Sequence, residues 1–192
     1  MSQTLFKQVD LFGGAIVAEI PSTFQDVSTI RQVPDNQEVF LDPDGFTSIT
    51  FDILERVEKS TDIEALKYHL SDIVDEDAAQ TKLHSSSTAV LAKMPQTTCL
   101  TLLATSPPGE KMRGRPNEPE FVGTLMVLVR LEAQKTDVVV TVNVPHLKGQ
   151  YEEGAVKLEE GRYGLLLEAG QVVKDRVLGS FEVRDWGLFV NE

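Results

Sequence analysis

The chain has 192 residues, with 18 Lys and Arg against 30 Asp and Glu, and its net charge is −12 at neutral pH. A chain of this length buries about 70% of the surface that its unfolded form exposes, so it needs no metal or disulfide for a stable core. The acidic balance argues against nucleic acid and anionic membranes as partners, because both are bound through basic surfaces. The single cysteine, Cys99, excludes an internal disulfide and favours a reducing compartment.

No targeting or membrane-spanning segment is expected. Residues 1–12 lack a basic start followed by a long apolar run. The longest apolar runs, such as residues 125–129, are far shorter than the ~20 residues that a bilayer requires. We expect residues 1–192 to form a single domain.

Strands and turns alternate through the first part of the chain. A strand is predicted at residues 15–20 and is ended by Pro21. Two more strands are predicted at 37–41 and 48–57, with the turn sequence Asp42-Pro43-Asp44-Gly45 between them. These two strands should form an antiparallel hairpin.

Residues 60–77 are predicted to form a helix. Thr61 and Glu64 have the spacing of a capping box. One apolar stripe is expected at helical intervals, consisting of Ile63, Leu66, Leu70, Ile73 and Val74. The remaining face is acidic, because residues 58–77 contain seven acids against Lys59 and Lys67.

The second half of the chain is predicted to continue the sheet and to end in a helix. Strands are expected at 87–93, 97–105, 121–132 and 138–144, a helix at 161–178, and an apolar tail packed on the sheet at 181–189. The strand at 121–132 is apolar on both faces, which is typical of a central strand covered on both sides. The order predicts an α+β fold, a single domain whose antiparallel β-sheet is covered on both faces. Residues 107–119, with four Pro, two Gly and a local basic cluster, are expected to be a flexible loop.

The chain has no motif that indicates an enzyme, a cofactor or a metal centre. Phosphate-binding GxxxxGK[ST] loops, GxSxG elbows and HExxH helices are absent from the sequence. His69 is expected at the surface or half-buried on its helix, and His84 and His146 in loops without neighbouring ligands. Cys99 is expected to be an inert core thiol. A binding protein is therefore favoured over an enzyme.

Two features indicate a binding surface. Asp35, Asn36, Gln37 and Glu38 crowd polar groups into the start of one strand, although a turn with capped backbone groups would also explain them. In the strand at 48–57, Asp52 lies on the face opposite Phe51, whereas Glu55 falls in register with the core residues. A carboxylate in that register is costly unless the strand ends there or the acid is paired, for example with Arg56. The alternative is an acid that faces a partner at the strand end.

At these features the sequence resembles the Mog-type nuclear import proteins, also called Ran guanine nucleotide release factors. The resemblance spans most of the chain in the same order, in the segments LFGGAI (11–16), DVSTIRQVPDNQEVF (26–40), FDILE (51–55), KYHLSD (67–72) and RLEAQKTDVVVTVNVP (130–145). It does not extend to the loop at 107–119.

The resemblance implies a PsbP-like α/β/α sandwich and a non-catalytic protein that needs no cofactor. It also implies binding to the small GTPase Ran, GTP-bound or nucleotide-free, release of the bound nucleotide, and support of protein import into the nucleus. The implied Ran-binding residues are Asp52 and Glu55, within a broader region that contributes Asp35, Gln37, Glu38 and Asp72. We expect a monomer in the nucleus and cytoplasm. An adaptor that binds Ran without exchange activity, or a ligand-binding protein on the same scaffold, are the alternatives.

Overall fold

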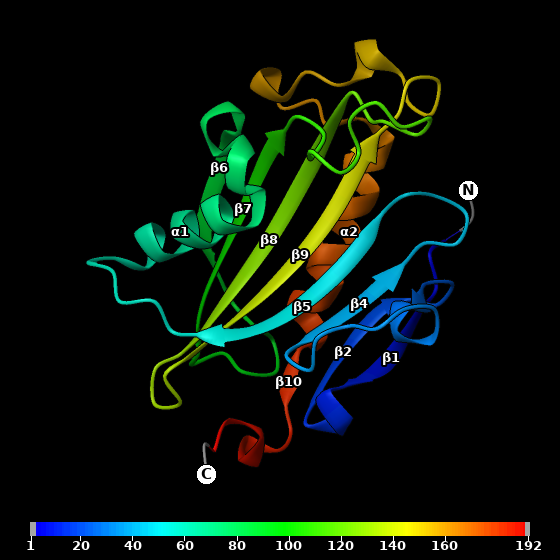
Figure 1. Cartoon of the computed structure of the whole chain (residues 1–192). Helices are drawn as coiled ribbons and strands as arrows, with labels where there is room; N and C mark the ends of the chain where they lie inside the picture. Colours follow the sequence, from blue (N-terminus) through cyan, green and yellow to red (C-terminus); the bar gives the residue numbers. More distant parts are fainter. Residues whose placement is uncertain (1–2, 191–192) are drawn as a thin grey trace.

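The computed structural model describes residues 3–190, which form two antiparallel sheets and two α-helices (Figure 1). In spatial order, the large sheet contains β3 (Gln25–Asp26), β4 (Gln37–Leu41), β5 (Ser48–Glu55), β9 (Thr136–His146), β8 (Phe121–Leu131), β7 (Thr98–Ser106) and β6 (Lys82–Ala89). The small sheet contains β1 (Phe6–Leu11), β2 (Ile16–Pro21) and β10 (Glu182–Val183). The predicted β4–β5 hairpin is confirmed, as is the antiparallel pairing of β8 with β9.

Helix α1 (Asp62–Val74) covers one face of the large sheet. The helix begins where Thr61 Oγ1 accepts a hydrogen bond from the Glu64 backbone N–H at 3.1 Å, as the capping-box spacing predicts. Its buried residues pack against β7, β8 and β9 in a cluster of Ala65, Leu66, Leu70, Leu100, Leu102, Ala104, Met126, Leu128 and Val139. The predicted stripe is confirmed at its centre, whereas Ile73 near the end of the helix is 40% exposed.

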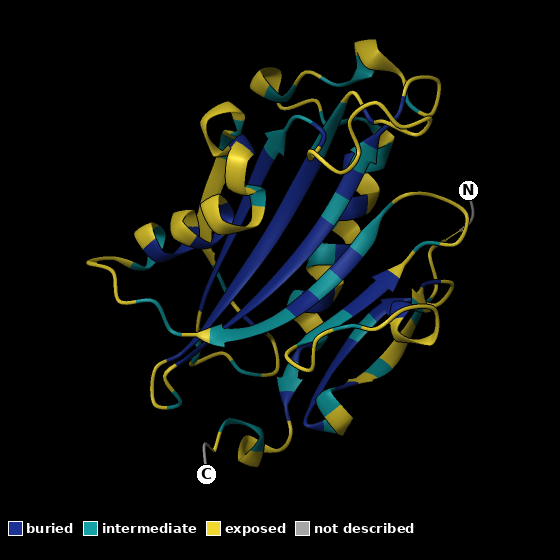
Figure 2. Cartoon of the chain, in the orientation of Figure 1, coloured by how far each residue is buried: buried dark blue, intermediate teal, exposed yellow. Residues whose placement is uncertain are grey.

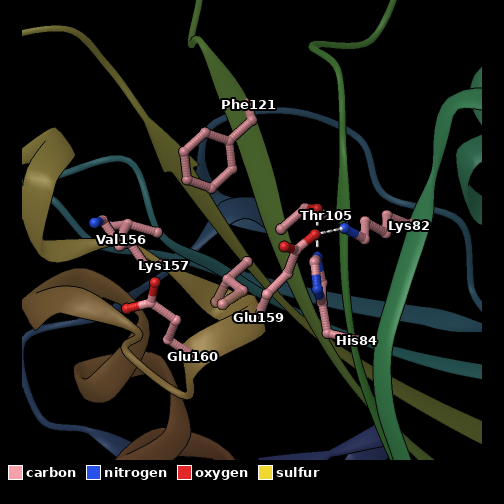
Figure 3. A pocket seen from close by; sticks show the side chains of 9 residues that line it. Lys82, His84, Thr105, Phe121, Val156, Lys157, Glu159 and Glu160 are labelled. Carbon is pink, nitrogen blue, oxygen red and sulfur yellow. Dashed lines mark hydrogen bonds and ion pairs between the residues drawn. The ribbon is translucent and has the colours of Figure 1, made fainter.

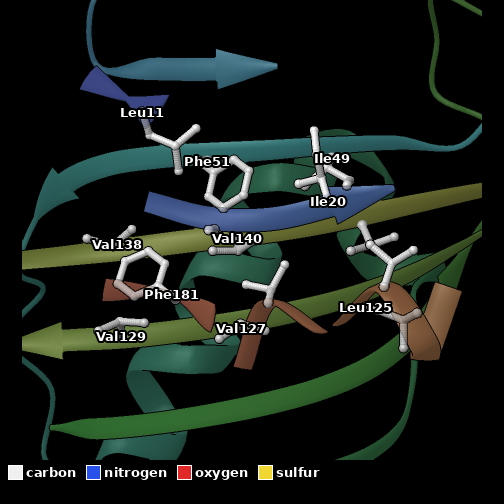
Figure 4. Packing of buried hydrophobic residues seen from close by; sticks show 14 of the residues in the cluster. Leu11, Ile20, Ile49, Phe51, Leu125, Val127, Val129, Val138, Val140 and Phe181 are labelled. Atoms are coloured by element: carbon white, nitrogen blue, oxygen red, sulfur yellow. The ribbon is translucent and has the colours of Figure 1, made fainter. Parts of the chain in front are cut away.

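Helix α2 (Gly164–Ser180) and the small sheet cover the opposite face. The main core lies here, and Figure 4 shows side chains of both sheets meeting in it, among them Leu11, Ile20, Ile49, Phe51, Leu125, Val127, Val129, Val138, Val140 and Phe181. Phe181 is fully buried and β10 pairs with β2, so the predicted packing of the C-terminal tail is confirmed. The molecule therefore has three layers, with the large sheet in the middle.

Strand β8 is buried on both faces, as its sequence predicts. Leu125, Val127 and Val129 belong to the core beneath α2, whereas Met126 and Leu128 belong to the core beneath α1. The central strands are accordingly the most deeply buried part of the chain (Figure 2). This arrangement confirms an α+β fold with helices on both faces, to which the small sheet is an addition.

The sequence does not predict β1 at all, and it predicts β6 at the wrong residues, because both strands contain few apolar residues. Strand β1 was missed because its burial is confined mainly to Leu11, which leaves no clear alternation of apolar and polar residues. Strand β6 lies at Lys82–Ala89 instead of 87–93, and it is a polar strand at the sheet edge. His84 is therefore in a strand and not in a loop.

The sequence predicts an apolar stripe of Leu166, Ala169, Val173 and Val177 on helix α2, and this stripe is confirmed in its second half only. Val173 and Val177 are buried, whereas Ala169 is exposed and Leu167 and Gly170 take the buried positions in the first half. A Cβ atom on Gly170 would lie 2.9 Å from side-chain carbons of Leu125 and Val144, so the helix approaches the sheet closely at this residue. A glycine on the buried face cannot be recognised from apolar periodicity, which explains the difference. No helix within residues 3–190 is long and apolar enough to cross a membrane.

Candidate functional site

The β4–β5 hairpin places Gln37 directly opposite Asp52. The two residues are cross-strand partners, and Gln37 Nε2 donates a hydrogen bond to Asp52 Oδ1 at 2.7 Å. Both side chains are half-buried. Directly opposed residues share one face of a sheet, so Gln37 and Asp52 lie together on the side that faces α1.

The surroundings of Asp52 favour its neutral form. Burial raises the pKa of this carboxyl above its ordinary 3.8, the hydrogen bond from Gln37 lowers it, the charge of Asp72 raises it and His69 lowers it, with a net increase. Asp72 and His69 both belong to α1, which confirms that Asp52 faces this helix. A cation brought to this carboxylate from outside would relieve the electrostatic cost that raises its pKa.

Glu55 is the last residue of β5 and is exposed. Because the strand ends here, the side chain reaches solvent although it is in register with Phe51. Arg56 pairs with Glu58 at 3.1 Å and not with Glu55, so the predicted alternative of a Glu55–Arg56 salt bridge is wrong. Within residues 3–190, no ion pair involves Asp52, Glu55 or the exposed Asp72.

Glu38 and Asp35 lie apart from Asp52. Glu38 is paired with Phe51, which places it on the opposite face of the hairpin from Asp52. Its Oε1 accepts a hydrogen bond from the Phe12 backbone N–H at 2.9 Å, which ties β4 to the connection between β1 and β2. Asp35 is exposed in the preceding turn, and both acids border an open cavity of about 620 Å³. Asp35 and Glu38 therefore lie away from Asp52, whereas Gln37 borders this cavity and also contacts Asp52.

Part of the polar segment at 35–38 has a structural explanation. Asn36 Nδ2 donates to the Ile53 carbonyl at 3.1 Å, and the Ile53 N–H donates to the Asn36 carbonyl at 2.9 Å. With the Glu38 contact, two of the four polar side chains thus satisfy backbone groups. The turn interpretation holds for Asn36 and Glu38, and it leaves Asp35 and the Gln37–Asp52 pair available to a partner.

A buried polar network lies next to this surface and was missed in the sequence. Asp137 is fully buried and accepts hydrogen bonds from His69 Nε2 (2.8 Å), from Arg130 Nε (3.1 Å) and from the Val57 N–H (3.1 Å). Arg130 also donates to Asp62 Oδ1 at 2.8 Å and to the Val57 carbonyl. Burial opposes ionisation of Asp137, but these donors outweigh it and hold its pKa below the ordinary 3.8.

The network fastens α1 to the sheet. His69 is only 2% exposed, so the expectation that it lies at the surface or is half-buried is wrong. A His–Asp pair with both side chains enclosed is inaccessible to a substrate, and a structural role follows. The sequence signal was present, because Arg130 and Asp137 are charged residues at the adjoining ends of two apolar strands and are cross-strand partners.

A second open cavity, of about 410 Å³, lies between β6, β8 and the segment at 156–160 (Figure 3). Lys82 forms an ion pair with Glu159 across it, and His84 Nε2 lies 2.8 Å from Thr105 Oγ1. Glu160 pairs with Arg162, whereas Lys157 forms no ion pair among the described residues. Among the described residues, no group of three or more His, Cys, Asp or Glu side chains suits a metal ion.

The loop at 107–119 is attached to the rest of the chain through Arg113. The sequence predicts a flexible loop, and Arg113 anchors it through an ion pair with the buried Asp77 and a hydrogen bond to the Pro108 carbonyl at 3.1 Å.

Cys99 is buried in β7, and burial raises the pKa of its thiol to about 12, as expected for an inert core thiol.

Comparisons with a family model and with known sequences identify the same family. A family model described as "Ran-interacting Mog1 protein" matches residues 9–145. The "Nuclear import protein MOG1" of Saccharomyces cerevisiae is 31% identical over 198 aligned positions, which cover 95% of this chain and 84% of that protein. The "Ran guanine nucleotide release factor" of Danio rerio is 32% identical over 142 positions, which cover 70% of this chain and 76% of that protein.

Comparison with solved structures identifies the same family. The crystal structure of the Saccharomyces cerevisiae Ran-binding protein Mog1p superposes with a TM-score of 0.76 and 25% identity, covering 98% of this chain and 100% of the other. The solution structure of cyanobacterial PsbP from Synechocystis has a TM-score of 0.55 and 12% identity, covering 95% of each chain, and shows a shared fold alone. The chain is a member of the Ran-interacting Mog1 protein family.

Proposed function

We propose that this protein binds the small GTPase Ran, promotes release of its bound guanine nucleotide and thereby supports protein import into the nucleus. It acts as a non-catalytic monomer in the nucleus and cytoplasm. The observation that carries the proposal is the family match over residues 9–145, which includes the whole β4–β5 hairpin and α1. The names of the yeast and zebrafish relatives describe the same two activities, nuclear import and nucleotide release.

The proposed contact surface includes Asp52, Gln37 and Asp72 on the side of the hairpin that faces α1, together with Glu55 at the exposed end of β5. Its acids have no ion-pair partner of their own among the described residues, and the chain as a whole is strongly acidic. A surface of this kind attracts a basic patch and steers its approach. Asp35 and Glu38 extend the acidic surface around the hairpin, with Glu38 also holding the hairpin against Phe12.

Nucleotide release then follows from differential binding. A GTPase holds its nucleotide through loops and side chains that contact the phosphates and Mg²⁺. If the acids of this surface pair with a basic residue that otherwise stabilises those loops, they favour nucleotide-free Ran. By linkage, a partner that prefers the nucleotide-free form weakens nucleotide binding by the same factor.

The test measures the dissociation rate of a fluorescent GTP analogue from Ran with and without the protein. We expect faster dissociation that saturates with protein concentration. A complex on a sizing column without any change in this rate would identify an adaptor that binds Ran without exchange activity. The absence of a complex with GTP-bound, GDP-bound and nucleotide-free Ran would contradict the whole proposal.

Binding to Ran should weaken as the pH falls, because of Asp52. Its pKa in the free protein is raised above 3.8, and pairing with a cation favours the charged form, so binding releases a proton wherever Asp52 is partly protonated. The affinity for Ran is therefore highest above the pKa of Asp52, and it decreases as the pH falls through that pKa. Asp52→Asn should bind more weakly at neutral pH and show a flatter pH dependence, measured by calorimetry as the pH is lowered from neutral.

A further inference from the structure

A more enclosed cavity is lined by the end of β9, by the loop that joins β9 to α2 and by the first turn of α2. Figure 1 shows this loop at the end of the large sheet opposite to the end of β5. The cavity has a volume of about 400 Å³, within the range of small-molecule sites. Its walls come from His146 at the end of β9, from Tyr151 and Ala155 in the loop, and from Leu165 and Leu166 in the first turn of α2. Most of this segment lies beyond residues 9–145, which the family model matches.

His146, which lines this cavity, carries an unused hydrogen-bond acceptor. The side chain is fully buried at the end of β9, so its predicted place in a loop is wrong. Nδ1 lies 2.8 Å from the Val144 carbonyl oxygen, a contact in which Nδ1 must donate. Burial lowers the pKa of His146, although the Val144 contact raises it, so the ring is neutral at physiological pH and Nε2 carries a lone pair. Nε2 is buried and has no hydrogen-bond partner within residues 3–190.

Aromatic neighbours hold the imidazole ring in this orientation. Phe121 stacks on it at 4.1 Å between ring centroids with planes 17° apart, and Tyr151 meets it edge-on at 4.9 Å. The Tyr151 hydroxyl in turn donates to Glu120 Oε2 at 2.9 Å. Together with the Val144 hydrogen bond, these contacts orient the ring. A fixed and buried acceptor of this kind is costly when unpaired, and an incoming donor would relieve that cost.

The opposite wall offers donors. Helix α2 has 17 residues, and no side chain caps its N-terminus. The first backbone N–H groups of a helix have no acceptor within the helix, and Gly164, Leu165 and Leu166 border the cavity. The remaining lining is largely apolar and includes Leu165, which is 84% exposed. A hydroxyl group suits both walls, because it donates one hydrogen bond and accepts others.

We propose that this cavity binds a small, uncharged and mostly apolar molecule whose hydroxyl group donates a hydrogen bond to His146 Nε2. The site is separate from the proposed Ran surface. Asp52 is paired with Val139 on β9, and His146 lies seven residues further along that strand, about 23 Å away. Ligand binding at His146 and the action on Ran can therefore be measured independently.

The test uses para-cresol as the probe and toluene as its matched analogue without the hydroxyl. In NMR titrations of the isotope-labelled full chain, para-cresol should shift the amide signals of His146, Gly149 and Leu166 to saturation and move the Nε2 resonance of His146. Para-cresol should bind at least tenfold more tightly than toluene, as expected when a buried acceptor gains a donor. No saturable shift, or equal affinity for the two probes, would overturn the proposal.

Two pairs of variants locate the probe. Ala155→Trp fills the cavity and should abolish binding, whereas Ala169→Trp places the same side chain on the exposed face of α2 and should leave binding unchanged. His146→Phe removes the acceptor but keeps an aromatic ring, and should bring the two probes to equal affinity. If His146→Phe fails to fold, the comparison of Ala155→Trp with Ala169→Trp still tests the location of the site. Undiminished para-cresol binding by Ala155→Trp would contradict it.

Discussion

Replacing Asp137 with Asn is expected to lower the free energy of unfolding by about 3 kcal/mol or more, as is typical when one partner of a buried ion pair is removed. Asp137 is fully buried, and its charge compensates that of Arg130, which is only 4% exposed. Whichever carboxylate oxygen the amide NH2 of Asn replaces, it faces a donor, because Oδ1 accepts from Arg130 Nε and Oδ2 accepts from the Val57 N–H. The loss is measured by denaturant unfolding at neutral pH.

The matched control is Glu132→Gln, which removes an exposed acid from the turn of the same β8–β9 hairpin. Its effect should stay within about 0.5 kcal/mol, as for most surface substitutions. A destabilisation by Asp137→Asn no larger than that of the control would show that the network does not stabilise the fold.

The effect of Asp137→Asn should depend on pH in a defined direction. The pKa of Asp137 in the folded chain lies below the ordinary 3.8, so the ionised carboxylate contributes stability that is complete above 3.8 and is lost as the pH falls through the folded value. The two proteins should therefore differ most near neutral pH and converge in acid. A difference that grows on acidification would contradict this origin of the stability.

Deeply buried, strongly apolar elements were the predictable part of this fold. Both faces of β8 and the capping box of α1 follow from local pattern alone, since each is decided by residues close in sequence. Strands β1 and β6 were missed or displaced because they are paired at sheet edges, where polar residues carry no periodic signal. The close approach of α2 depends on Gly170, whose lack of a side chain also leaves no signal.

The candidate site was predictable in composition but not in geometry. Asp52 and Gln37 could be recognised as polar residues of one hairpin, but their pairing depends on register, which the turn length sets. Glu38 was grouped with them by proximity in sequence, although alternation places it on the other face. The Arg130–Asp137 pair lies within the β8–β9 hairpin and left a sequence signal, but the contact of His69 with Asp137 joins distant segments and cannot be derived from one sequence.

Charge reversal of Asp52 and Glu55 to Lys together should abolish the acceleration of nucleotide release from Ran and weaken complex formation roughly 100-fold, because like charges placed against a basic patch cost several kcal/mol. Glu55 is exposed at the end of β5, so Lys is accommodated there without strain. The measurement is the dissociation rate of the fluorescent GTP analogue, with the affinity from calorimetry.

The control must change the net charge by the same amount as the Asp52/Glu55 variant without altering the proposed Ran contact surface. Glu168→Lys with Asp175→Lys does so, because both are exposed acids of α2 on the opposite side of the large sheet. If the control loses acceleration to the same extent as the site variant, the attraction is a property of overall charge, and no specific role remains for the hairpin. If only the site variant loses it, the contact lies at the hairpin.

Asp52 needs a gentler variant as well, because it is half-buried and hydrogen bonded to Gln37. Asp52→Asn keeps the shape and removes only the charge, and since burial already raises the pKa of Asp52, its folded stability should not fall. A folded Asp52→Asn protein with weakened Ran binding would assign the effect to the charge itself. Wild-type binding and exchange by Asp52→Asn, combined with loss in Glu55→Lys alone, would move the contact to the end of β5 and leave Asp52 with a structural role.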